Sequence, residues 1–242
     1  MKENKKVYTS FHDVPIRDYM YFPKGTIEVD KPGKFSKIEV IHLLISMFVL
    51  TLAFSFALTG NNLVNGFNHG FDLNNLLNFI PISFLGVVSA FFFHELSHKF
   101  MAQKYGLWAE FRMFPVGLLI ALLLSLAAGV VFAAPGAVMF RGGSRTFETG
   151  RIAAAGPLAN IIISLIAFPL YLFVFFETEI GQIVGFICLI NAFLAVFNLL
   201  PIGPLDGIKI IRWNKNIWIL MLIISIILTM VAFFRVSPII YL

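Results

Sequence analysis

Two histidines four residues apart, with a glutamate between them, stand in the segment His94-Glu95-Leu96-Ser97-His98. On an α-helix, positions i and i+4 lie about 40° apart around the axis and about 6 Å apart along it. Both imidazole rings can therefore reach one Zn²⁺ from the same face of a helix. Glu95 then lies beside the metal, where a general base would meet a water molecule. The spacing predicts a catalytic zinc site with His94 and His98 as ligands.

The surroundings of this motif are apolar. The preceding run, residues 79–93, contains no charged residue, as is typical of a membrane helix. Hydrophobic residues make up 59% of the chain and charged residues only 13%, against about 25% charged in soluble domains. Basic residues occur in short clusters beside apolar segments, so we interpret them as topology signals and expect no nucleic-acid partner. The composition predicts a multi-pass protein of the cell membrane, with the lipid bilayer as its surroundings.

The apolar segments predict an all-α polytopic fold with about five to six transmembrane helices. Residues 1–37 are charged and interrupted by prolines, which predicts an N-terminal extension in the cytoplasm; residues 38–242 are predicted to be embedded in the membrane. The expected helices cover 38–58, 79–105, 150–176, 182–200 and 217–234. Between the second and third, a β-like stretch at 108–114 precedes an apolar run at 116–134 and a Pro- and Gly-rich region at 135–143.

A third zinc ligand is needed, because zinc hydrolases hold three protein ligands and leave the fourth position to water. His12, His42 and His69 are poorly placed, in the extension, at the start of the first helix and in a loop on the other side. Asp206 is the best candidate, since it follows prolines and glycines that break the helix near membrane depth, where irregular backbone often marks a site. The alternative for this segment is an ordinary turn with Asp before Gly.

The position of Asp206 also constrains the topology. If 116–134 crossed the membrane fully, Asp206 would lie about 30 Å from the histidines. Zinc bonds of about 2 Å forbid that separation, so we predict a re-entrant element after the zinc helix, with a full crossing as the alternative. With an N-terminus inside, every Lys and Arg except Arg235 then falls on the cytoplasmic side, as the positive-inside rule favours. The N-terminus and the site are thus expected to face the cytoplasm.

With these features the chain resembles the site-2 proteases, a family of intramembrane zinc metalloproteases. The matching segments are His94 to His98, Gly156-Pro157-Leu158-Ala159-Asn160 and Asn198-x-x-Pro201 with Leu205-Asp206-Gly207, which together span roughly 94–210. The resemblance implies that His94, His98 and Asp206 bind one Zn²⁺ per chain and that Glu95 is the base. It also implies that 38–242 is a metalloprotease domain that hydrolyses peptide bonds in or near transmembrane segments of other membrane proteins, as in regulated intramembrane proteolysis.

Two asparagines receive roles from the same resemblance. Asn160 is expected to act in catalysis by holding the substrate backbone or the oxyanion, since a neutral amide can donate to developing negative charge. The alternative for Asn160 is a hydrogen bond between packed helices. Asn198 is expected to position the loop or the substrate. A sheet-like element that pairs with an unwound substrate is expected at 108–114 and 135–143.

Two other kinds of protein remain as alternatives. A catalytically silent zinc-binding scaffold would keep the fold, but a structural zinc site needs no base such as Glu95. A zinc transporter would need several membrane-embedded acidic or histidine residues along a path, whereas the chain offers one site.

Overall fold

The computed structural model describes residues 34–65, 70–132, 134–141, 145–176 and 178–240. Most of the predicted N-terminal extension therefore lies outside the described residues. Within the described ranges, five helices are long and apolar enough to cross a membrane. They are Lys37–Asn65, Leu73–Lys104, Thr146–Phe173, Glu179–Leu199 and Lys215–Arg235. The prediction of an all-α polytopic membrane protein is confirmed.

The second span is a continuous rod that carries the zinc motif in its last part. It consists of α3 (Leu73–Val87), the π-helix η3 (Val88–Phe92) and α4 (Phe93–Lys104). The rod begins several residues before the expected position 79, because the side chain of Asp72 caps it by accepting a hydrogen bond from the Asn75 backbone. Within η3 the turn is wider, and a widened turn of this kind is frequent at functional sites.

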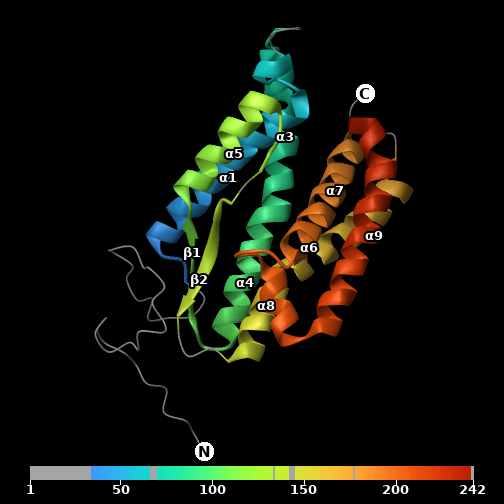
Figure 1. Cartoon of the computed structure of the whole chain (residues 1–242). Helices are drawn as coiled ribbons and strands as arrows, with labels where there is room; N and C mark the ends of the chain where they lie inside the picture. Colours follow the sequence, from blue (N-terminus) through green and yellow to red (C-terminus); the bar gives the residue numbers. More distant parts are fainter. Residues whose placement is uncertain (1–33, 66–69, 133, 142–144, 177, 241–242) are drawn as a thin grey trace, which may run out of the picture.

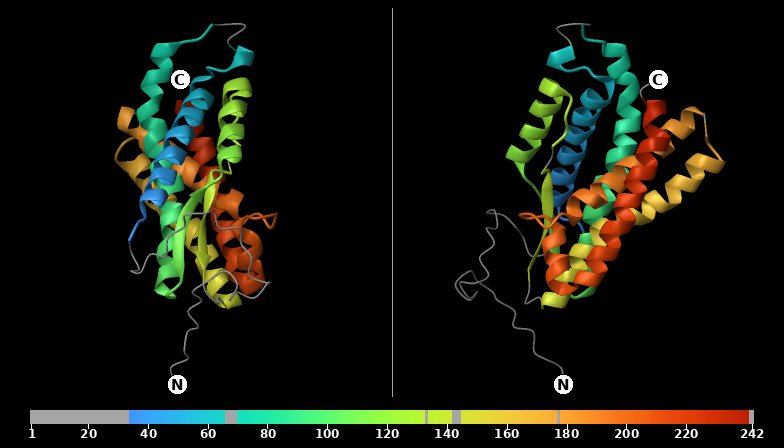
Figure 2. Two further views of the ribbon diagram at one scale, coloured as in Figure 1. Left: turned by 90° about the vertical axis from the view of Figure 1, so that its left-hand side faces the viewer. Right: turned by 45° about the vertical axis from the view of Figure 1, so that its right-hand side comes forward.

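After α4, the helix that carries the zinc motif (the zinc helix), the chain makes an excursion. It runs through β1 (Trp108–Met113), α5 (Pro115–Ala128) and β2 (Gly136–Arg141). The two strands are antiparallel, with Met113 opposite Gly136, so the chain leaves and returns at the same place (Figures 1 and 2). With 14 residues α5 is about 21 Å long, short of the roughly 30 Å hydrocarbon core. The predicted re-entrant, β-like element is therefore present.

The return segment lies close against α5. A side chain at Gly117 would collide with the backbone carbonyl of Ala134, so a glycine there permits the close approach. The backbone N–H of Phe114 donates to the carbonyl of Pro135 at 2.9 Å, which closes the base of the excursion. These contacts allow the excursion to pack as one unit against α1 (Lys37–Thr59).

The remaining helices form the other side of the molecule, with the α3–α4 rod between them and α1 (Figures 1 and 2). They are α6 (Thr146–Phe173), α7 (Glu179–Leu199), α8 (Asp206–Trp213) and α9 (Lys215–Ile240). Helix α6 packs against α4, α7 and α8. Small residues at 153–156 are buried on α6, and they let its backbone approach the zinc helix. The short helix α8 was not predicted from the sequence.

The fold predicts which ends of the spans share a side of the membrane. In a chain with Cys188→Ser, we expect cysteines at Lys104 and Thr146 to react with a membrane-impermeant maleimide from the same side. A cysteine at Asn74, at the start of the α3–α4 rod, should react from the opposite side. Labelling of right-side-out and inverted vesicles measures this. Labelling of Lys104→Cys and Thr146→Cys from opposite sides would contradict a re-entrant excursion and require a full crossing.

Candidate metal centre

Three buried ligand groups converge between α4 and α8. His94 and His98 lie one turn apart on α4, and Asp206 is the first residue of α8. Oδ2 of Asp206 lies 3.4 Å from Nε2 of His94 and 3.1 Å from Nε2 of His98. All three side chains are buried, and the structure thus brings together the two predicted histidines and the predicted carboxylate.

The separations fit a single zinc ion. Zinc–nitrogen and zinc–oxygen bonds of about 2.0–2.1 Å in a tetrahedral arrangement place two ligand atoms about 3.3 Å apart. The two Nε2 atoms lie 3.0 Å apart and face each other. Two imidazole lone pairs at that distance repel unless a cation lies between them. A carboxylate oxygen of Asp206 beside these two nitrogens completes a three-ligand donor set for one zinc ion.

The other nitrogen of each ring is held by α6. Nδ1 of His94 lies 2.6 Å from Oδ1 of Asn160, and Nδ1 of His98 lies 2.7 Å from the backbone carbonyl of Ile152. Both partners are acceptors, so each Nδ1 donates its proton and each Nε2 keeps its lone pair for a metal. Gly156 makes this approach possible, because a Cβ at that position would meet both rings, 2.6 Å from Nε2 of His94.

Asn160 is fully buried in a network between helices. Its amide nitrogen donates to the carbonyl of Ala90 in η3 at 2.8 Å and to Oδ1 of Asn191 in α7 at 2.9 Å. Asn191 in turn donates to Ser89 Oγ at 3.0 Å. These contacts match the interhelical alternative for Asn160, and both donors of its amide are used. Its predicted role in holding the substrate or the oxyanion stays a prediction that no contact here supports.

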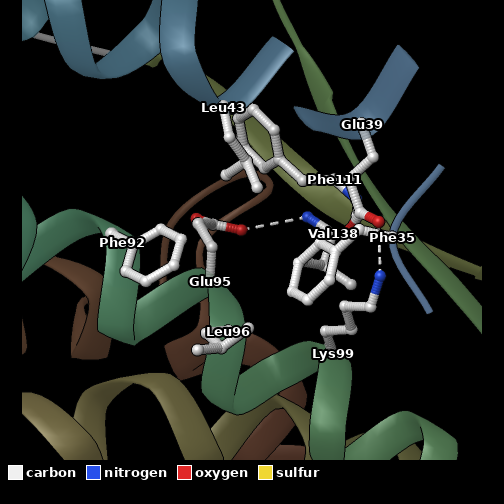
Figure 3. A pocket seen from close by; sticks show the side chains of 9 residues that line it. All are labelled: Phe35, Glu39, Leu43, Phe92, Glu95, Leu96, Lys99, Phe111 and Val138. Carbon is white, nitrogen blue, oxygen red and sulfur yellow. Dashed lines mark hydrogen bonds and ion pairs between the residues drawn. The ribbon is translucent and has the colours of Figure 1, made fainter. Parts of the chain in front are cut away.

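Glu95 points toward the sheet. Its Oε2 accepts a hydrogen bond of 3.0 Å from the backbone N–H of Val138 in β2 (Figure 3). The carboxylate is held between α4 and β2, and it lines the same cleft as the three candidate ligands. A base in that position can receive a proton from a water molecule bound in the cleft.

The cleft around the site has a volume of about 350 Å³. One wall is formed by Phe132, residues 134–138 and Phe140 of the return segment and β2, and the other by α7 and the loop before α8. The predicted residue Asn198 lines the cleft from α7, where its side-chain nitrogen donates to the carbonyl of Leu194 at 3.1 Å. The walls are largely apolar, which suits an extended peptide with apolar side chains.

Sequence reasoning missed several residues that touch the site. Ile152 acts through a backbone carbonyl and Val138 through a backbone N–H, which no sequence motif reveals. Asn191 could have been noticed as a polar residue inside an apolar helix, and the same holds for Lys99, which directly follows the zinc motif. Lys99 forms a fully buried ion pair with Glu39 of α1.

Comparisons with known proteins agree with the site. No protein-family model and no solved structure matches the chain. A provisionally named zinc metalloprotease of Methanocaldococcus jannaschii is 41% identical over 187 residues, which cover 76% of this chain and 89% of that protein. A provisionally named zinc metalloprotease of Bacillus subtilis is 30% identical over 157 residues, covering 56% and 70%. A further zinc metalloprotease of M. jannaschii is 29% identical over 146 residues, covering 59% and 37%.

The metal follows from the relatives and the donor set together. Two imidazoles and one carboxylate, all buried, form the three-ligand donor set that is typical of catalytic zinc. The names of the relatives specify the same metal. The cofactor is zinc.

The geometry predicts that Asp206 is needed to hold the metal. We expect the purified chain to contain about one zinc per molecule and D206A to lose it, since two imidazoles alone bind zinc weakly. Metal analysis of the detergent-purified proteins measures this. D72A, which removes an aspartate from a helix N-cap away from the site, should keep its zinc. Zinc retained in D206A at the level of the wild type would mean that another group completes the site.

The contacts of Asn160 predict a second effect on the metal. Replacing it with leucine removes the acceptor for Nδ1 of His94, so we expect N160L to bind zinc about 10–100-fold more weakly. N160D keeps an acceptor for Nδ1 of His94 but loses the two donor contacts to Ala90 and Asn191, so it should bind zinc more tightly than N160L and less tightly than the wild type. Competition with a zinc-sensitive chelating dye measures the affinities. Equal affinities of N160L and the wild type would contradict a positioning role.

Proposed function

Since the chain belongs to the zinc metalloprotease family of these relatives, we propose that it is an intramembrane protease of the site-2 type. In this proposal it hydrolyses peptide bonds in or near transmembrane segments of other membrane proteins. Residues 38–242 are the metalloprotease domain. The N-terminus and the active site face the cytoplasm, in keeping with the distribution of Lys and Arg along the chain.

The observation that carries the proposal is the place of the candidate metal centre. His94, Glu95 and His98 lie within the apolar span Leu73–Lys104, and the cleft beside them is walled largely by apolar side chains. A protease that acts on soluble proteins has no reason to hold its zinc ligands in a membrane-spanning helix. Membrane-embedded ionisable residues generally mark function, because they are costly to place there.

The chemistry divides among four residues of this chain. We assign His94, His98 and Asp206 as the zinc ligands and Glu95 as the general base. Bound zinc supplies Lewis acidity, which lowers the pKa of a water molecule toward 7 and polarises a carbonyl group. Glu95 accepts a proton from the water as it attacks the scissile carbonyl. Glu95 then returns that proton to the nitrogen of the leaving amine, which breaks the peptide bond.

The backbone N–H of Val138 supports this role of Glu95. A carboxylate held by one fixed N–H keeps its orientation and leaves its second oxygen for the proton transfer. Asn160 acts through His94: it fixes the orientation of the His94 ring and is a positioning residue in this assignment. Asn198, which lines the cleft, positions the loop or the substrate.

The substrate must unwind before it can be cut, because a helix hides its carbonyls in i to i+4 hydrogen bonds. The outer edge of β2 lies along the cleft, and an unwound segment can pair with a strand edge as an added strand. Substrates with Gly, Pro or Asn near the cut unwind at least cost. The proposed partners are therefore membrane proteins with such a transmembrane helix.

The test is cleavage by a chain that lacks only the base. We expect the wild type in proteoliposomes to cut a tagged single-span reporter with a Gly-Pro pair in the middle of its membrane helix. E95Q should keep one zinc and cut about 10³-fold more slowly, because the loss of a general base costs about that much. Gel analysis of the fragments measures the rates. A reporter with Leu-Leu in place of the pair is the control and should stay largely uncut.

Two results would contradict the proposal. Cleavage by E95Q at the rate of the wild type would exclude Glu95 as the base. A wild-type chain that holds zinc and cuts neither reporter would favour the zinc-binding scaffold.

A further inference from the structure

A fully buried ion pair lies behind the catalytic base. Lys99 of α4 and Glu39 of α1 are each about 1% exposed at their side chains, and they contact each other (Figure 3). Lys99 also donates to the carbonyl of Lys34 at 3.2 Å and lies 4.0 Å from the centre of the Phe35 ring. Lys99 stands one helical turn after Glu95, so the pair and the base share the same part of the zinc helix.

Glu39 and Glu95 hold the two opposite edges of the ribbon at the same position. Phe111 of β1 is paired with Val138 of β2. The N–H of Phe111 donates to Oε1 of Glu39 at 3.0 Å, and the N–H of Val138 donates to Oε2 of Glu95 at 3.0 Å. Both N–H groups point away from the partner strand, as in a non-hydrogen-bonded pair of an antiparallel ladder. One carboxylate therefore caps each edge of the ribbon.

These contacts form a closed ring of interactions. Glu95 accepts a hydrogen bond from Val138, Val138 is paired with Phe111 across the ribbon, and Phe111 donates to Glu39. Glu39 contacts Lys99, and the turn of α4 between Lys99 and Glu95 completes the ring. A small cavity of about 10 Å³ lies inside it, lined by Glu39, Lys99 and Glu95 together with apolar side chains (Figure 3). The base thus contacts one edge of the ribbon while the buried ion pair contacts the other edge at the same position.

A gain in stability does not by itself account for the burial of Lys99 and Glu39 as an ion pair. Two charges in a membrane-embedded interior lose their hydration, and a pair of apolar side chains of similar size often stabilises a fold as well or better. The Glu39 side chain also does not cap the N-terminus of its own helix. Ser36 and Glu39 have the spacing of a capping box, and Ser36 Oγ does accept from the Glu39 N–H, but the Glu39 carboxylate turns to the ribbon and Lys99.

We propose that Glu39 is a positioning residue of the active site that fixes the β1–β2 ribbon against the zinc helix. Lys99 neutralises the buried Glu39 carboxylate, and Oε1 of residue 39 holds the N–H of Phe111. Because Phe111 is paired with Val138, the N–H of Val138 is then held against Glu95. The outer edge of β2 thereby stays along the cleft, beside the base. The proposal rests on the proposed proteolytic function, in which that edge and that base act on one substrate.

Two double variants test it. E39Q/K99M and E39M/K99M both remove both buried charges, so neither leaves a lone charge. They differ in whether residue 39 can accept a hydrogen bond from Phe111. We expect E39Q/K99M to cut the Gly-Pro reporter within about threefold of the wild type, and E39M/K99M to lower kcat by about 10²-fold, as a misplacement of about 1 Å can. The change in KM should be smaller than the change in kcat.

Three further measurements separate positioning from mere folding. Both variants should bind one zinc per chain and melt at similar temperatures. Hydrogen exchange at 108–113 should be faster in E39M/K99M than in E39Q/K99M, because only the former leaves the Phe111 N–H without its acceptor. E39L/K99M provides a second apolar pair if E39M/K99M fails to purify.

Equal activity of the two double variants, whether high or low, would overturn the proposal. So would a loss of activity in E39M/K99M that follows from a loss of zinc. Failure of the proposed function has a different signature, because the zinc-bound wild type would then leave the reporter intact. The exchange difference between the two variants would still test how the ribbon is held.

Discussion

The short length of zinc bonds is the constraint on which the rest of the structure depends. Because the ligand atoms of one zinc ion lie about 3.3 Å apart, every helix that carries a ligand must place it at the same depth in the membrane. His94 and His98 satisfy this locally, through one turn of α4, but Asp206 comes from the start of a different helix. The chain between His98 and Asp206 must therefore return to the depth of the two histidines. Because the excursion through β1, α5 and β2 starts and ends at the same place, the two helices that follow, α6 and α7, run away from that depth and back to it before Asp206.

Around this centre, every polar group needs a partner inside the protein, because lipid offers none. Helix α6 supplies the partners of both imidazole rings. Its small residues at 153–156 bring it against α4, its carbonyl at Ile152 holds one imidazole and Asn160 holds the other. The network continues through Asn191 to Ser89 in the widened turn of η3. The same contacts that satisfy buried polar atoms also orient the candidate ligands, so the packing of the helices and the geometry of the metal centre are linked.

The two-stranded ribbon depends on the helices around it. Two strands alone are marginally stable, and both edges of this ribbon are held by carboxylates from neighbouring helices. A ribbon held in this way keeps its register while the outer edge of β2 stays along the cleft. In our proposals this edge receives the substrate, so the glutamate that performs the proton transfer also anchors the strand.

The sequence by itself determined the elements and the chemistry that local spacing and composition encode. The i, i+4 histidines, the apolar spans and the return of the chain implied by Asp206 were predictable, since helix geometry, bilayer thickness and zinc bond lengths fix them. Only the tertiary structure decided which groups meet across helices. It turned Asn160 toward His94, joined Lys99 to Glu39 and set the N–H of Val138 on Glu95. Backbone acceptors and donors carry no signature in the sequence, and the direction of a buried amide or ammonium depends on the neighbours that packing supplies.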